Sequence, residues 1–167
     1  MDDAQKESAK TEHQQLFQQE RKASRVLMLQ YLYGCDCRQT WSATPEELDS
    51  FFALAAEADE QFSEAAMKSG IRRARKLLPQ LCELVPKLDE LIAKASDNWS
   101  LQRMGRIDLN ILRLGAFEFL YVQGISVAIA INEAVELAKT YGQSNEAPQF
   151  INGVLQQIHN LTATQQA

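Results

Sequence analysis

The chain has 167 residues, of which 46% are hydrophobic, and its formal net charge at pH 7 is −5. This length suits one domain with a core large enough to need no disulfide or metal to hold it together. The negative total argues against a protein that coats nucleic acid without regard to sequence, although a local basic patch can still bind phosphates because charges are screened over short distances.

The cysteine content and the apolar stretches limit which cellular compartment and which cofactors are consistent with the sequence. Cys35, Cys37 and Cys82 are an odd set, which argues against a disulfide framework and favours reduced thiols. One residue separates Cys35 from Cys37, unlike the two-residue gap typical of zinc pairs, and no second Cys/His pair exists, so we expect no metal and no cofactor. The start of the chain lacks the apolar segment of a signal peptide, and the most apolar stretch, residues 111–131, is broken by charged residues. We therefore expect a cytoplasmic protein with no membrane partner.

The first part of the chain is predicted to hold a polar start, one helix and a connection. Residues 1–10 are polar and are expected to form a disordered extension. Apolar residues at helical spacing predict a helix from about residue 11 to residue 33. Residues 34–42, which begin with a glycine, are expected to connect this helix to the next.

A helix start is clearly signalled by three residues. Thr44 is a preferred N-cap, Pro45 suits the first helical position, and Glu47 completes a capping box. The sequence predicts that this helix runs to about residue 58.

Two prolines interrupt the helical pattern that follows. A helix is predicted over about residues 61–78. Pro79 and Pro86 are expected to end it, which leaves a separate short helix over about residues 85–95.

The last part of the chain has the clearest helical pattern. Apolar stripes predict helices over about residues 107–123, 128–141 and 148–161. No stretch shows the alternation expected of a strand. The sequence therefore predicts an all-α fold class: a single compact domain of about seven helices over residues 11–162, followed by a flexible tail over residues 163–167.

Two clusters of basic residues stand out against the acidic total. One, on the first predicted helix, consists of Arg21, Lys22 and Arg25. Guanidinium groups bind phosphate oxygens or stack on unpaired bases, but basic triplets are also common on solvated helix faces. The second cluster consists of Arg72, Arg73, Arg75 and Lys76. A solvated helix face is its simpler interpretation, and a second RNA contact is the alternative.

Three blocks in the second half of the chain resemble the NusB family. They come in the family's order and spacing, and they are residues 103–114 (RMGRIDLNILRL), 130–139 (AINEAVELAK) and 150–155 (FINGVL). Residues 21–25 (RKASR), with Tyr33 after them, resemble the arginine-rich first helix of that family. The resemblance covers about residues 98–160 and this first segment, whereas residues 38–95 match only in helical character. It implies a NusB-like all-helical RNA-binding domain.

The resemblance also implies a function. NusB-type proteins pair with NusE, a ribosomal protein of the small subunit. The pair binds the boxA element of nascent RNA and helps the RNA polymerase elongation complex to pass terminators, especially on ribosomal RNA operons. Carried over to this chain, the RNA-binding candidates are Arg21, Lys22, Arg25, Tyr33 and Phe150. The candidates for docking the basic NusE partner are Asp108 and Glu118. No catalytic residue is implied, and we expect a protein that is not an enzyme.

Gly153 is an unusual residue for the last predicted helix, because glycine inside a helix costs about 1 kcal/mol relative to alanine. Close packing against another helix would explain it. A backbone that lies near RNA would explain it as well.

The first motif departs from the family pattern, and other functions remain open. Ala23 and Ser24 stand where further basic residues are usual, and Glu12 and Glu20 lie close by. One alternative is the NusB-like N-terminal module of a ribosomal RNA cytosine methyltransferase, which needs a following α/β domain with a glycine-rich loop. Another is a protein-interaction module in which RNA binding has been lost. Family members also occur as homodimers, so a second copy of the chain is a further candidate partner.

Overall fold

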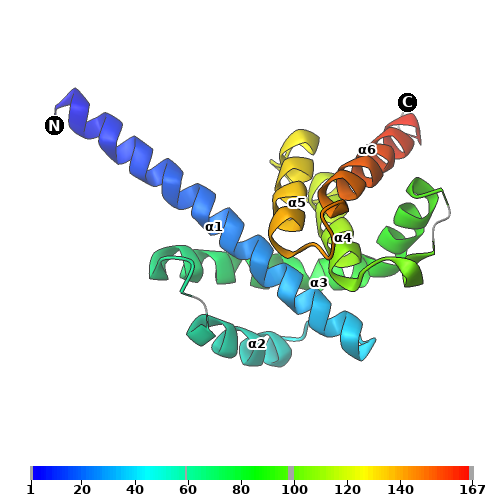
Figure 1. Ribbon diagram of the computed structural model, residues 1–167. Coiled ribbons are helices and arrows are strands. Elements are labelled where there is room, and N and C mark those ends of the chain that lie inside the picture. The colour runs from blue at the N-terminus through cyan, green and yellow to red at the C-terminus, as the bar shows by residue number, and fades with distance from the viewer. Residues whose placement is uncertain (1, 59, 98–99, 166–167) are drawn as a thin grey trace. The chain divides into compact units, whose positions relative to one another are not determined.

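The computed structural model describes residues 2–58, 60–97 and 100–165, and over these ranges it contains helices and no strand (Figure 1). The all-α prediction is confirmed. The described ranges hold six α-helices and one 3-10 helix, in line with the expected number of about seven. In chain order they are α1 (Asp3–Arg38), α2 (Pro45–Ala58), α3 (Glu64–Ala95), η1 (Leu101–Arg103), α4 (Arg106–Tyr121), α5 (Val127–Tyr141) and α6 (Ala147–Gln165).

The chain groups into two compact units, where the sequence led us to expect one compact domain over residues 11–162. Unit 1 consists of residues 1–31 and 43–79, and unit 2 consists of residues 32–42 and 80–167. Helices α1 and α3 each contribute residues to both units. The predicted partition into extension, domain and tail stays a prediction.

In unit 1, α2 begins where the sequence predicts it. The backbone N–H of Glu47 donates to Oγ1 of Thr44 at 3.2 Å, and the backbone N–H of Thr44 donates to Oε2 of Glu47 at 2.9 Å. This reciprocal pair is the capping box, and it satisfies two backbone donors at the helix start. Further along, the rings of Tyr31 on α1 and Phe51 on α2 pack edge to face, with 5.1 Å between their centroids.

Two helices of unit 1, α1 and α3, approach each other closely at Gly70 of α3. A Cβ atom added to this residue would lie 2.8 Å from the Cβ of Ala23 and 3.1 Å from the backbone nitrogen of Ser24, both on α1. Only a residue without a side chain lets the two backbones come this close. On the side of α3 that faces α2, Arg75 forms an ion pair with Asp49.

Helix α1 is longer than the pattern predicts at both ends. It begins at Asp3 rather than near residue 11, and every residue from 3 to 19 is exposed. Figure 1 shows the first half of α1 extending beyond the parts of α2 and α3 that belong to unit 1. At the other end the helix continues through Gly34, which was expected to open a connection, and stops at Arg38. The polar, exposed turns at the start of the helix carry no hydrophobic period, so the pattern does not mark them as helical.

Helix α3 is continuous through Pro79 and Pro86, so the prediction of two separate helices is wrong. Both prolines are exposed. The buried stripe of the helix passes them without interruption and consists of Ala74, Leu78, Leu81, Cys82, Val85, Leu88 and Ile92. Burial of this stripe outweighs the cost of about 3 kcal/mol that a proline brings to a helix interior. The division between the two units falls directly after Pro79.

In unit 2, the last three helices pack on one another. A Cβ atom added to Gly115 of α4 would lie 2.9 Å from Cδ1 of Leu155 on α6 and 3.2 Å from the Cβ of Ala134 on α5, so this glycine sits where the three helices meet. The ends of these helices lie within a few residues of those predicted from their apolar stripes.

Arg113 of α4 is 4% exposed and organises a polar network inside unit 2. Its Nε and Nη2 donate to the two carboxylate oxygens of Asp89 on α3 at 2.7 and 2.8 Å. Its Nη1 donates to Asp36 on α1 at 3.1 Å and to the side-chain oxygen of Asn110 at 2.9 Å. The guanidinium also lies 4.7 Å from the ring centroid of Trp41. The network ties the end of α1 and the second half of α3 to α4.

Candidate nucleic-acid interface

Of the three basic residues predicted on α1, only Lys22 is fully on the surface. Arg21 is half-buried, and its guanidinium carbon lies 4.6 Å from the ring centroid of Phe17, one turn earlier on α1. Arg25 is 6% exposed. The helical period explains part of this, because residues 21 and 25 share a face and a residue one position away lies about 100° round the helix. Lys22, with Arg21 beside it, is therefore the part of this segment that offers charge to a ligand.

The two aromatic candidates belong to unit 2. Tyr33 is 43% exposed, so part of its side chain is open to solvent. Phe150 lies in the first turn of α6 and is half-buried. A base-stacking side chain must be at the surface. Tyr33 meets that condition and Phe150 meets it in part.

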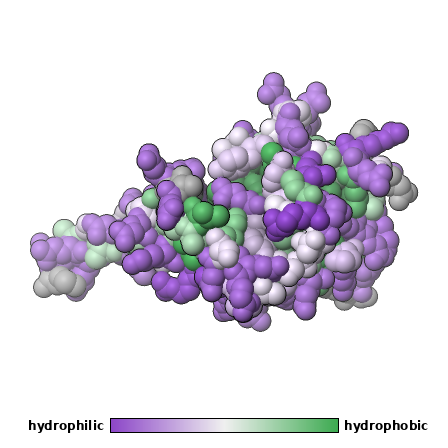
Figure 2. All heavy atoms as spheres, turned by 90° about the horizontal axis from the view of Figure 1, so that it is seen from below, coloured by the Kyte–Doolittle hydropathy of each residue, from purple (hydrophilic) through white to green (hydrophobic). Residues whose placement is uncertain are grey.

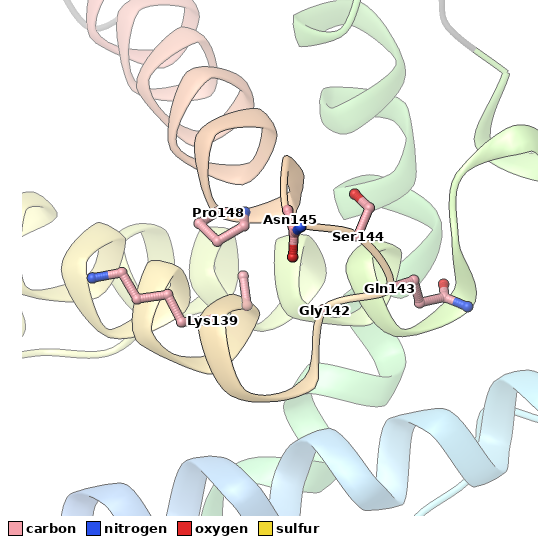
Figure 3. Close-up of a pocket in the computed structure, with 7 residues that line it drawn as sticks. Lys139, Gly142, Gln143, Ser144, Asn145 and Pro148 are labelled. Atoms are coloured by element: carbon pink, nitrogen blue, oxygen red, sulfur yellow. The ribbon is translucent and has the colours of Figure 1, made fainter.

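The loop between α5 and α6 borders a hollow of about 340 Å³ in unit 2 (Figure 3). Its polar lining includes Gln143, Ser144 and Asn145. In Figure 3 the side chain of Lys139 points away from Asn145, and its Nζ donates to Glu136 at 2.8 Å. Amide and hydroxyl groups bind base edges and backbone oxygens in unpaired nucleic acid. Sequence analysis did not single out this loop, because its polar residues resemble those of any connection.

A glycine fixes the start of this loop. A Cβ atom added to Gly142 would lie 2.3 Å from the carbonyl oxygen of Ala138 and 2.8 Å from the Cβ of Ala147. The φ of Gly142 is −59°, so the residue is needed for close approach and not for a left-handed turn. The turn brings the end of α5 close to the beginning of α6.

The two carboxylates expected to dock a partner lie inside unit 2. Asp108 is 8% exposed and Glu118 is 2% exposed, which is at odds with a direct contact surface. Oδ1 of Asp108 accepts a hydrogen bond from the backbone N–H of Gln143 at 3.3 Å. Burial raises the pKa of Asp108 above its ordinary value, and the hydrogen bond from Gln143 partly offsets this. These contacts give Asp108 a structural task in holding the loop that borders the hollow, and its part in docking stays a prediction.

The surface formed by the described residues offers polar groups and few large apolar side chains. Figure 2 shows hydrophilic residues over most of one face, with small hydrophobic patches between them. Within residues 2–58, 60–97 and 100–165, the exposed large hydrophobic side chains include Leu16, Phe17, Tyr33, Leu54 and Ile129. Among the described residues, no helix combines the length and the apolar character that crossing a membrane requires.

Comparisons with known proteins place the chain in a family. The family model described as the NusB family matches residues 22–160. The transcription antitermination protein NusB of Myxococcus xanthus is 37% identical over 138 residues, which cover 83% of this chain and 93% of that protein. The chain belongs to the NusB family. Its relatives carry the name of a transcription antitermination protein, which describes a regulator and not an enzyme.

Solved structures of NusB share the fold. The solution structure of NusB from Aquifex aeolicus has a TM-score of 0.69 and 28% identity, and the match covers 89% of this chain and 93% of that one. A chain in the crystal structure of a plectonemic RNA supercoil also has a TM-score of 0.69 and 28% identity, over 87% of this chain and 97% of that one. The NusB match begins at Lys22, so residues 1–21 precede the part of the chain that the family model describes.

Proposed function

We propose that this chain is a transcription antitermination factor that binds boxA-like single-stranded RNA together with NusE. In this role it acts on the RNA polymerase elongation complex and suppresses termination, above all on ribosomal RNA operons. The observation that carries the proposal is membership of the NusB family over residues 22–160, with curated relatives that bear the antitermination name. That a similar chain occurs in the crystal structure of an RNA supercoil supports RNA as the ligand.

In unit 1 the RNA contact falls to Arg21 and Lys22. The ammonium of Lys22 is exposed and binds phosphate as a compact charge. Arg21 lies over the ring of Phe17, which holds the guanidinium flat and ready to bind phosphate or to stack on a base. Arg25 is nearly buried, so we assign it the task of holding α1 in place rather than a phosphate contact.

In unit 2 the RNA contact falls to an aromatic ring and to the loop that follows α5. Tyr33 presents an exposed ring on which an unpaired base can stack. The hollow beside Asn145 offers amide and hydroxyl groups for hydrogen bonds (Figure 3). Such groups distinguish base edges, whereas the cations of unit 1 bind phosphates in any sequence.

Two phosphate contacts give only weak binding, which explains the need for a partner. Each phosphate neutralised on a single strand releases about 0.7 of a counterion, so Arg21 and Lys22 contribute a salt slope of about −1.4. NusE extends the surface and adds its own contacts. The expected result is RNA affinity that rises when NusE is present.

The test is fluorescence anisotropy with a short boxA-like RNA and a scrambled RNA of equal length, with and without NusE, over a series of salt concentrations. We expect wild type to prefer the boxA-like RNA, and NusE to strengthen that binding. The variant Arg21→Gln/Lys22→Gln should lose affinity and lower the salt slope by about 1.4. This pair is preferred to any change at Arg25, whose burial makes a folding defect the expected outcome.

The matched control removes two other cations from the same helix. Lys6 and Lys10 are exposed and precede the family match, so Lys6→Gln/Lys10→Gln changes the net charge equally. This control should bind like wild type. NusE binding without any RNA affinity would instead identify a protein-interaction module and overturn the proposal.

A further inference from the structure

The exposed face of α3 in unit 1 carries a concentration of positive charge that the candidate RNA site does not use. Between residues 64 and 79 there are five cationic side chains and one carboxylate, in a chain whose net charge is −5. Three of the cations recur at intervals of four residues, so they lie one above the other on one face of the helix. We call these three, Lys68, Arg72 and Lys76, the α3 stripe.

The neighbours of the α3 stripe show that it is open to a ligand. Arg75 is drawn aside by its ion pair with Asp49 and by the ring of Phe52, whose centroid is 5.2 Å from its guanidinium carbon. Within the stripe, Lys68 approaches Glu64 at 3.7 Å, a surface pair of small effect. Arg72 and Lys76 are exposed and form no ion pair with any residue that the structure describes.

The stripe does not serve the stability of unit 1. Lys68 and Arg72 are a like-charge pair at a spacing of four residues, and so are Arg72 and Lys76. Such pairs destabilise a helix. Arg72 also lies about 200° round α3 from Gly70, so it points away from the contact with α1. A ligand that brings negative charge would remove the repulsion.

We propose that the α3 stripe binds the phosphate backbone of the RNA that flanks the boxA-like element. This inference rests on the proposed function for the identity of the ligand. A nucleic acid fits the stripe better than an acidic protein, because protein interfaces are built round buried aromatic and apolar anchors and the stripe has none. The stripe consists of cations alone, and we expect these to bind phosphates, which adds affinity in any sequence context.

The experiment compares two RNAs that share one boxA-like core. The short RNA contains the core alone, and the long RNA adds single-stranded flanks on both sides. Affinity is measured by fluorescence anisotropy with the full chain and NusE, for wild type and for Arg72→Gln/Lys76→Gln. The control is Lys87→Gln/Lys94→Gln, which removes two exposed cations from the part of α3 in unit 2.

We expect the Arg72→Gln/Lys76→Gln variant to bind the short RNA like wild type and the long RNA more weakly. Its salt slope on the long RNA should be smaller by about 1.4, so its deficit should shrink about sevenfold when the salt concentration is raised fourfold. The preference for boxA over a scrambled core should not change. Thermal unfolding of the variant should be no earlier than that of wild type, because two repulsive pairs are relieved.

The outcomes separate this inference from the proposed function. If wild type prefers boxA and the variant binds the long RNA as tightly as wild type does, the stripe has no RNA contact. The inference then fails while the proposed function is unaffected. An equal loss in the Lys87→Gln/Lys94→Gln control shows an effect of net charge and also overturns it. If boxA preference is absent but affinity for the long RNA still depends on Arg72 and Lys76, the proposed function fails and the stripe stands.

Discussion

Arg113 in unit 2 and Arg72 in unit 1 show two opposite uses of arginine. In unit 2, Arg113 is 4% exposed and donates to Asp89, Asp36 and Asn110, so its charge is neutralised by partners inside the protein. In unit 1, Arg72 is exposed and its charge meets no carboxylate among the described residues. A buried cation that is fully paired fixes the arrangement of helices. An exposed cation whose neighbours are also cations contributes little to the stability of the fold, and it is accessible to a ligand.

The largest effect expected from this contrast is the loss of the buried charge. Arg113→Met should lower the free energy of unfolding by about 3 to 5 kcal/mol, because Asp36 and Asp89 would keep their charges without a partner. Urea unfolding followed by circular dichroism measures the change. Adding Asp36→Asn and Asp89→Asn to Arg113→Met should recover part of the loss. Arg72→Gln, the matched change in unit 1, should stay within about 0.5 kcal/mol of wild type.

A second contrast is between two helical glycines. Gly70→Ala should destabilise the chain by about 1 to 2 kcal/mol, because the new Cβ would meet Ala23 and the backbone of Ser24, and this overpacking outweighs the gain in helix propensity. Urea unfolding would again measure it. An alanine variant as stable as wild type would show that α1 and α3 shift apart at little cost.

Gly153→Ala should have a smaller effect of the opposite sign. Nothing lies within 4 Å of the position that its Cβ would take, so close packing does not explain this glycine. We expect a gain of up to about 1 kcal/mol in the free energy of unfolding. If the backbone of α6 lies near RNA, as the second explanation holds, the same variant should bind boxA-like RNA less tightly. Unchanged RNA affinity would remove that explanation.

The smallest effect is a pH dependence carried by Asp108. Burial raises the pKa of this carboxyl in the folded protein above its ordinary value of 3.8. The raised pKa means that the protonated carboxyl stabilises the folded protein. This contribution is fully present below pH 3.8 and is lost as the pH rises through the folded pKa. Asp108→Asn keeps an acceptor for the N–H of Gln143 and should raise the melting temperature at neutral pH. Melting curves recorded from acid to neutral pH should show that difference vanish at low pH.

The sequence predicts the parts of the fold whose evidence is local. The capping box of Thr44 and Glu47 is one such part, and the apolar stripes of α4, α5 and α6 are another. The rule that prolines end helices gives a wrong prediction at Pro79 and Pro86. The burial of residues on the other face of α3 outweighs the cost of the two prolines. Arg113 lies outside the reach of such local rules. Its partners, Asp36 and Asp89, come from distant parts of the chain, and no spacing rule links them.

The candidate site was predicted less completely than the fold. Sequence spacing places Arg21 and Arg25 on one helical face but does not say which face is buried, so the near-burial of Arg25 was not foreseen. The same limit applies to Asp108 and Glu118, which the docking hypothesis places at the surface and the structure buries. The hollow beside the loop after α5 depends on the close approach at Gly142, and that contact exists only once the helices have packed.

The exposed first half of α1 implies a gradient of local stability along one helix. Residues 3–19 are exposed on all sides, so their helicity rests on short-range hydrogen bonds and on pairs such as Lys6 with Asp3. A helical segment of this kind frays readily, whereas the turns round Ala23 open only when their tertiary contacts do. Amide hydrogens should therefore exchange fast near Asp3 and slow down stepwise toward Ala23, and a protease should cut the chain first within these exposed turns.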